Sequence, residues 1–339
     1  MFGLSKLTVW VFTGLVATAT IFFNSYIFLV SLWRQKDKKQ RSPSDIIIIA
    51  LSVSNTIYQL VSYIWMTMDI IDVRCRIDQM FYTILLLVIM GLKFTILWDT
   101  SFLAFYYSTK LVTAPNRCYT QIHTAILKHV TLAVFVIALT GLATCIPVLI
   151  VFHPNNQTAV NKDCGILLPD STAGQIYNIV FLILSDVLPG LIMLKCCVSI
   201  SFHLGMHLHH MKASTNGAHP PKLGSQMRVI QMALTLVINF LIFLIADLYV
   251  NYQIVVNHDS SVGVTILVMS AFAAVTATVL IYGKKTLWKA LIHEINSCLD
   301  EEGNTFHRPQ VRSAETLTAP NTAETEQEDC SPNPHAELK

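Results

Sequence analysis

The stretch that decides the fold is residues 7–33, LTVWVFTGLVATATIFFNSYIFLVSLW, which contains no charged side chain. About 20 apolar residues are enough for a helix to cross the hydrocarbon core of a bilayer. The stretch is too long for the apolar core of a signal peptide and lacks a small-residue cleavage site. We therefore expect a membrane-spanning helix that is retained in the mature protein.

Six further apolar stretches follow, and the whole composition agrees with them. Hydrophobic residues make up 53% of the chain and charged residues 13%, whereas soluble domains carry about 25% charged residues. A soluble enzyme, a coiled coil, a collagen and a disordered protein are thereby excluded. The sequence predicts an all-α membrane protein, a seven-transmembrane helix bundle with spans at 7–33, 46–68, 80–107, 130–152, 176–202, 229–252 and 262–283.

Several other classes of function leave no trace in the sequence. The net charge is only +2, so no nucleic-acid partner is expected. The eight cysteines form no CxxC pair with zinc-ribbon spacing, and there is no HExxH, GxSxG or Walker loop. We expect no enzyme activity, no cofactor and no metal.

The loop charges predict the orientation in the membrane. With the N-terminus outside, and counting as far as residue 300, 14 lysines and arginines fall on inner segments and 4 on outer segments. Inner loops of membrane proteins are enriched in these residues. The first residues are therefore predicted to lie outside, and residues 284–339 in the cytoplasm.

Two features of the outer segments agree with this orientation. Asn156 begins an Asn-Gln-Thr triplet, an acceptor for N-glycosylation, in the longest outer loop. Cys75 and Cys164 are the only cysteines in outer segments. The outside is oxidising, so they could form a disulfide; two free thiols are the alternative.

Seven spans with the N-terminus outside and a cytoplasmic tail are the arrangement of a G-protein-coupled receptor. A transporter or a light-driven pump is the competing class. A retinal protein needs a lysine in its seventh span, and residues 262–283 contain none. The third span ends in Phe105-Tyr106-Tyr107 instead of the Asp-Arg-Tyr of the rhodopsin class.

Partial motifs in several spans resemble the type 2 (bitter) taste receptor family. They are the stretch around Asn24, the run from Ser44-Asp45 to Ser54, the spacing of Trp98, Tyr107 and Lys110, the set Leu204, His207 and Met211, and Gly217 with Pro221. The resemblance covers residues 15–291. Asn55 replaces the arginine of the family, and Thr276-Ala277 replaces its His-Ser pair. We interpret the chain as a divergent, non-mammalian member, with a vomeronasal type 1-like receptor or a seven-helix transporter as alternatives.

The resemblance implies a chemosensory receptor of the plasma membrane. Such a receptor binds small organic tastants and activates a heterotrimeric G protein through helix rearrangement. Aligned on Trp98, Ile89 and Lys93 occupy positions that face the ligand cavity in the family. We expect the ligand to be bound by residues in the outer half of the bundle: Ile89, Met90, Lys93, Phe94, Tyr177, Asp186, Phe240, Phe243, Asp247 and Met269.

Charged residues within the spans are costly to bury, so they indicate pairing or function. Lys93 is expected to pair with Asp186, either as a purely structural ion pair or as a group that also binds acidic ligands. Asp247 is predicted to be solvated at the outer rim or to line the mouth of the pocket. Asp99 is expected to pair with the amides of Asn24 and Asn55.

The inner ends of the spans are expected to contact the G protein through Tyr106, Tyr107, Lys110, Pro115, Arg117, His207 and Met211. His203 and His207 are one helical turn apart, but the end of a fifth receptor helix explains them better than a metal site does.

After the last span, residues 284–300 have an amphipathic pattern that is typical of a helix at the membrane surface, in contact with lipids. Cys298 at its end is a candidate for palmitoylation. Residues 301–339 are polar and are predicted to be a disordered cytoplasmic tail. Their serines and threonines could accept phosphate from a kinase and recruit an arrestin, or the tail is inert.

Overall fold

The computed structural model describes residues 6–36, 42–72, 74, 76–111, 128–151, 172–214, 224–257 and 262–306. Within these ranges, the following side chains lie outside the description: 34–36, 111, 150–151, 204, 207–214, 224–226, 255–257 and 298–306. The chain divides into two units, Met1–Leu291 and Ile292–Lys339. The first unit contains the helix bundle.

All seven predicted spans are helices, and the described residues contain no strand. The prediction of a seven-helix membrane bundle is thus confirmed. The spans are formed by α1 (Lys6–Lys36), α2 (Pro43–Ile71), α3 (Gln79–Leu111), α5 (Val130–Cys145) with α6 (Pro147–Val151), α7 (Thr172–Leu182) with η1 (Ile183–Val187) and α8 (Leu188–Ser214), α9 (Gly224–Asn257) and α10 (Val262–Gly283).

Two of the spans are interrupted, each next to a proline. The fourth span breaks between α5 and α6, just before Pro147. In the fifth span a single π-helical turn, η1, precedes Pro189. Proline has no amide hydrogen and cannot donate the regular helical hydrogen bond, so the helix must adjust locally. The adjustment in the fifth span places Asp186 within the π turn.

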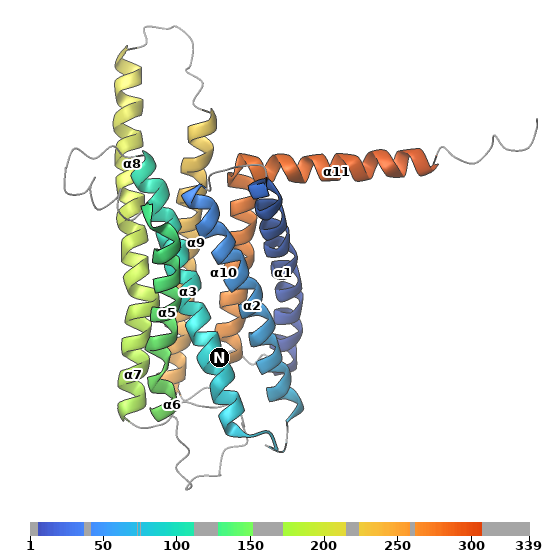
Figure 1. The fold of residues 1–339 in the computed structure, drawn as a ribbon. Coiled ribbons are helices and arrows are strands. Elements are labelled where there is room, and N and C mark those ends of the chain that lie inside the picture. Colours follow the sequence, from blue (N-terminus) through green and yellow to red (C-terminus); the bar gives the residue numbers. More distant parts are fainter. Residues whose placement is uncertain are drawn as a thin grey trace, which may run out of the picture. The chain divides into compact units, whose positions relative to one another are not determined.

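Helix α3 occupies the centre of the bundle (Figure 1). It contacts α2, α5, α8 and α9, while α1 closes the ring by contacting α2 and α10. Of the seven spans, α3 and α10 are the most buried. Side chains on α3 can therefore reach partners on several other helices.

The approach of α3 to α5 depends on two glycines. A methyl group added at Gly141 would lie 2.9 Å from the carbonyl oxygen of Gly91 and 3.0 Å from the ring of Phe94. Small residues of this kind allow membrane helices to pack closely. The outward faces carry large apolar side chains, such as Phe22 and Ile245, which are about two-thirds exposed and suit contact with lipid tails.

The chain bends at Lys284, directly after α10, and continues as α11 (Lys285–Phe306). The hydroxyl of Tyr26 on α1 donates a hydrogen bond to the carbonyl of Leu287 at 3.0 Å. Lys284 forms an ion pair with Asp45 at the inner end of α2. A helix thus covers residues 285–300 of the segment predicted to be an amphipathic helix, and it extends six residues into the segment that was predicted as the tail.

Candidate functional site

Three charged side chains meet inside the bundle. Lys93 of α3 donates a hydrogen bond to Asp247 Oδ2 of α9 at 2.8 Å. The same ammonium nitrogen lies 3.1 Å from Asp186 Oδ1 of the π turn. Both carboxylates are fully buried, and the Lys93 side chain is 9% exposed. We call Lys93, Asp186 and Asp247 the charged cluster.

Each member reaches the cluster from a different span. Lys93 lies 14 residues after the start of α3, which is about 21 Å along the helix. Asp186 accepts a short hydrogen bond from the neighbouring Ser185 hydroxyl. Asn251, one turn after Asp247 on α9, donates to Asp247 Oδ2 at 3.0 Å. The cluster therefore ties the third, fifth and sixth spans together, in the halves that are predicted to face outside.

The predicted pairing of Lys93 with Asp186 is present, but Lys93 also pairs with Asp247, which was not predicted. Asp247 was predicted to be solvated at the rim or to line the pocket mouth; it is instead fully buried and bound to Lys93. The sequence gives depth along a helix but not rotation about it, so the inward orientation of Asp247 was missed. With all three groups ionised, the cluster carries one positive and two negative charges.

Aromatic rings surround one side of the cluster. The ammonium of Lys93 lies 5.6 Å from the ring centre of Phe243, within the range of a cation–π contact. Phe243 packs against Phe272 at 4.8 Å between ring centres, and Phe240 packs against Phe272 at 5.9 Å. Phe272 was absent from the predicted site, because an apolar residue in an apolar span carries no distinguishing signal.

The remaining predicted ligand residues fall into two groups. Ile89 and Met269 are buried in the main core, to which Phe240 and Phe243 also belong. Phe94, Met90 and Tyr177 lie in a second apolar cluster with Cys145 and Phe181, between α3, α5 and α7. The Tyr177 hydroxyl donates to the carbonyl of Thr144 at 3.1 Å. Phe94, Met90 and Tyr177 therefore lie in a different apolar cluster from Phe240 and Phe243.

Asp99 does not have the partners that were predicted for it. Asn55 donates a weak hydrogen bond to Asn24 at 3.5 Å. Asp99 is fully buried, and neither of its carboxylate oxygens is hydrogen-bonded to any described residue. The prediction failed because neighbouring depths on three helices do not guarantee that the side chains face one another.

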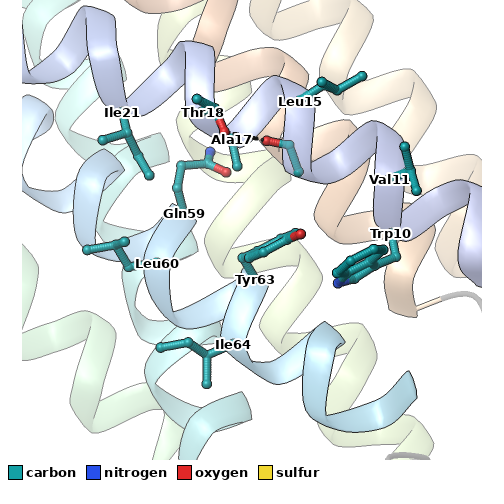
Figure 2. Close-up of a pocket in the computed structure, with 11 residues that line it drawn as sticks. Trp10, Val11, Leu15, Ala17, Thr18, Ile21, Gln59, Leu60, Tyr63 and Ile64 are labelled. Atoms are coloured by element: carbon teal, nitrogen blue, oxygen red, sulfur yellow. Dashed lines mark hydrogen bonds between the residues drawn. The ribbon is translucent and has the colours of Figure 1, made fainter. Parts of the chain in front are cut away.

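A separate groove of about 350 Å³ lies between α1 and α2 (Figure 2). Trp10 and Tyr63 stack along it with ring centres 5.6 Å apart, and the Trp10 indole donates to Thr67 at 2.9 Å. Leu15 and Leu60 on its walls are half or more exposed, so the groove opens at the perimeter of the bundle and not into its core. The groove contains none of the predicted site residues.

Two of the residues predicted for G-protein coupling are buried. Tyr106 and Tyr107 are 6% and 7% exposed, and their rings pack at 5.4 Å. Lys110 is exposed, with its ammonium 5.9 Å from the ring centre of Tyr106. At the same end of the bundle, the Arg228 guanidinium of α9 lies 6.0 Å from the ring centre of Tyr282 on α10. At this end of the bundle, Tyr106 and Tyr107 of α3 are thus part of the main core, and Arg228 of α9 contacts α10.

Several predicted residues cannot be placed. Pro115, Arg117, Asn156, Cys75 and Cys164 lie outside the described residues. His207, Met211 and Cys298 are within described helices, but their side chains are outside the description. The predicted tail beyond Phe306 is also outside it. Among the described residues, no group of three potential metal ligands occurs.

A comparison with known protein families gives one match that covers most of the chain. The model of the family described as "Taste receptor protein (TAS2R)" matches residues 1–298. The match includes all seven spans and the charged cluster. It favours the taste-receptor interpretation over the vomeronasal and transporter alternatives, and it is a match to receptors rather than to enzymes.

Proposed function

The chain belongs to the TAS2R taste receptor family, and from this premise we propose that it detects small organic molecules and activates a heterotrimeric G protein. The charged cluster is the observation that carries the proposal. It joins α3, η1 and α9 through contacts of 3.1 and 2.8 Å. A ligand that contacts any member can therefore change how these three spans are held.

The rings of Phe240, Phe243 and Phe272 supply an apolar surface beside the cluster. Sites for small organic ligands are mostly apolar, with a few polar groups that fix orientation. We propose that the ligand lies against these rings with a polar group at the cluster. Ile89 and Met269 belong to the same core and complete the proposed site.

At the inner face, activation requires the packed ends of the helices to separate. Tyr106 and Tyr107 are buried, so a G protein reaches them only after a rearrangement. An outward rigid-body shift of α9 would break the contact between Arg228 and Tyr282. We propose that loss of the Lys93–Asp247 hydrogen bond permits this shift, and that the receptor acts in the plasma membrane.

The proposal is tested by ligand-driven nucleotide exchange. Membranes from cells with the receptor at their surface are mixed with a purified heterotrimeric G protein, and bound guanosine triphosphate is measured across a panel of small organic compounds. We expect exchange with a subset of the compounds. Solute flux without exchange would identify a transporter instead, and silence of a folded receptor toward the whole panel would contradict the proposal.

A further inference from the structure

With all three groups ionised, the charged cluster carries more negative than positive charge, and this sets the kind of ligand that it can accept. Lys93 supplies one positive charge against the carboxylates of Asp186 and Asp247. Ion pairs within membrane spans are normally balanced, because unpaired charge is costly in a low-dielectric interior. Among the described residues, no second cation lies within ion-pair distance of either carboxylate.

Two carboxylate oxygens in the cluster also accept no hydrogen bond of good geometry. Neither Asp186 Oδ1 nor Asp247 Oδ1 receives a well-directed hydrogen bond from a described residue, although Lys93 is in ion-pair contact with the former. Both residues are fully buried. Buried polar atoms are nearly always hydrogen-bonded, so these oxygens identify a place for an additional N–H donor.

From these observations we propose that the ligand is an organic cation, a protonated amine whose N–H groups bind Asp247 Oδ1, which has no described donor, and Asp186 Oδ1, which only Lys93 contacts. The ligand then supplies the second positive charge, and the cluster becomes neutral. This inference rests on the proposed function, because it names the ligand class of the same site. It differs from the alternative in which Lys93 also binds acidic ligands, since an acid would add a third negative charge.

The surroundings of the cluster suit the rest of such a molecule. The ring of Phe243 already lies 5.6 Å from one ammonium, that of Lys93. Phe243, Phe240 and Phe272 pack against one another in the core, and aromatic rings attract cations and apolar groups alike. An arylalkylamine therefore finds acceptors for its ammonium and aromatic contacts for its ring within one site.

Binding is measured on the purified full-length receptor, separately from signalling. The probes are phenethylamine, its uncharged N-acetyl derivative and 3-phenylpropanoic acid, each titrated at pH 7.4 while the midpoint of thermal unfolding is followed. We expect the amine alone to raise the midpoint. Asp247→Asn should raise the amine concentration that gives half of the midpoint shift by about tenfold or more, because it removes the charge of one acceptor. Asp186→Asn provides a second variant if the first does not fold.

A matched control and separate outcomes keep the inference distinct from the proposed function. Asp69→Asn removes a carboxylate that pairs with Lys6 at the outer rim, 3.5 Å away, and should leave the amine response unchanged. Stabilisation by the acid or the amide but not the amine overturns the inference, as does stabilisation by acidification with no effect of the amine. Amine binding without nucleotide exchange supports the inference while contradicting the proposed function.

Discussion

Lys93 illustrates how a single buried charge depends on all of its partners. Its ammonium is held by Asp247 at 2.8 Å and by Asp186 at 3.1 Å. Lys93→Met would leave two buried carboxylates without a counter-ion, at a cost of about 3–5 kcal/mol. We expect surface expression to fall steeply, as measured by flow cytometry of an N-terminally tagged receptor.

The rescue experiment differs from the one that a simple pair would suggest. For a Lys93–Asp186 pair, the double change Lys93→Met with Asp186→Leu should restore expression. Because Asp247 also binds Lys93, we expect the double variant to remain impaired and the triple variant with Asp247→Leu to recover. Full recovery of expression in the double variant would show that Asp247 does not need Lys93 as its counter-ion. Lys6→Met, at an exposed ion pair, should cost less than about 1 kcal/mol.

Asp99 presents the opposite case, a buried carboxylate without described partners. An unsatisfied buried polar group costs about 1–3 kcal/mol, and more if it is charged. Asp99→Leu should therefore raise the midpoint of thermal unfolding of the purified receptor. A lower midpoint would mean that Asp99 has a partner in the folded protein. Thr100→Val on the next residue, which removes a hydroxyl bonded to its own helix at 2.7 Å, should change the midpoint little.

At the scale of elements, the turn between α2 and α3 is organised by one side chain, Asp72. Its carboxylate accepts hydrogen bonds from the backbone amides of Arg76 at 2.7 Å and Ile77 at 3.0 Å, and from the Tyr82 hydroxyl at 3.4 Å. These donors favour the ionised form. The amide of Arg76, first among them, lowers the pKa of Asp72 below its ordinary value. The turn is thus most stable when Asp72 is charged.

This arrangement predicts a pH dependence. The stabilisation by Asp72 is complete above the pKa of the unfolded carboxyl, about 4, and is lost as the pH falls through the lower pKa of the folded protein. Asp72→Asn should therefore unfold at a lower temperature than the wild type at pH 7. The difference should shrink as the pH approaches 3. An equal difference at both pH values would show that charge is not what holds the turn.

At the scale of the whole molecule, the orientation in the membrane remains a prediction from the loop charges. Glycosidase digestion should change the electrophoretic mobility of the wild type but not of Asn156→Gln. Equal shifts in both would mean that another acceptor is used or that the orientation is wrong. An epitope inserted at position 320 should bind antibody only after cells are permeabilised, since the positive-inside rule places that segment in the cytoplasm.

The sequence by itself determined the number of spans, the class of fold and the resemblance to taste receptors. Span number follows from composition over about 20 residues, a property that needs no knowledge of neighbours. The family resemblance rests on local motifs such as those around Asn24 and Trp98, and the family match over residues 1–298 bears it out. The π turn before Pro189 was not predicted from the sequence.

Only the tertiary structure decided which charged residues meet. Lys93 and Asp247 are 154 positions apart in the chain, and their contact depends on the rotation of α9 about its axis and on its distance from α3. The same packing left Asp99 without described partners and buried Tyr106 and Tyr107. Periodicity fixes which residues share a face of one helix. It does not fix which face of a neighbouring helix they meet, and the balance of charge in the proposed site depends on that.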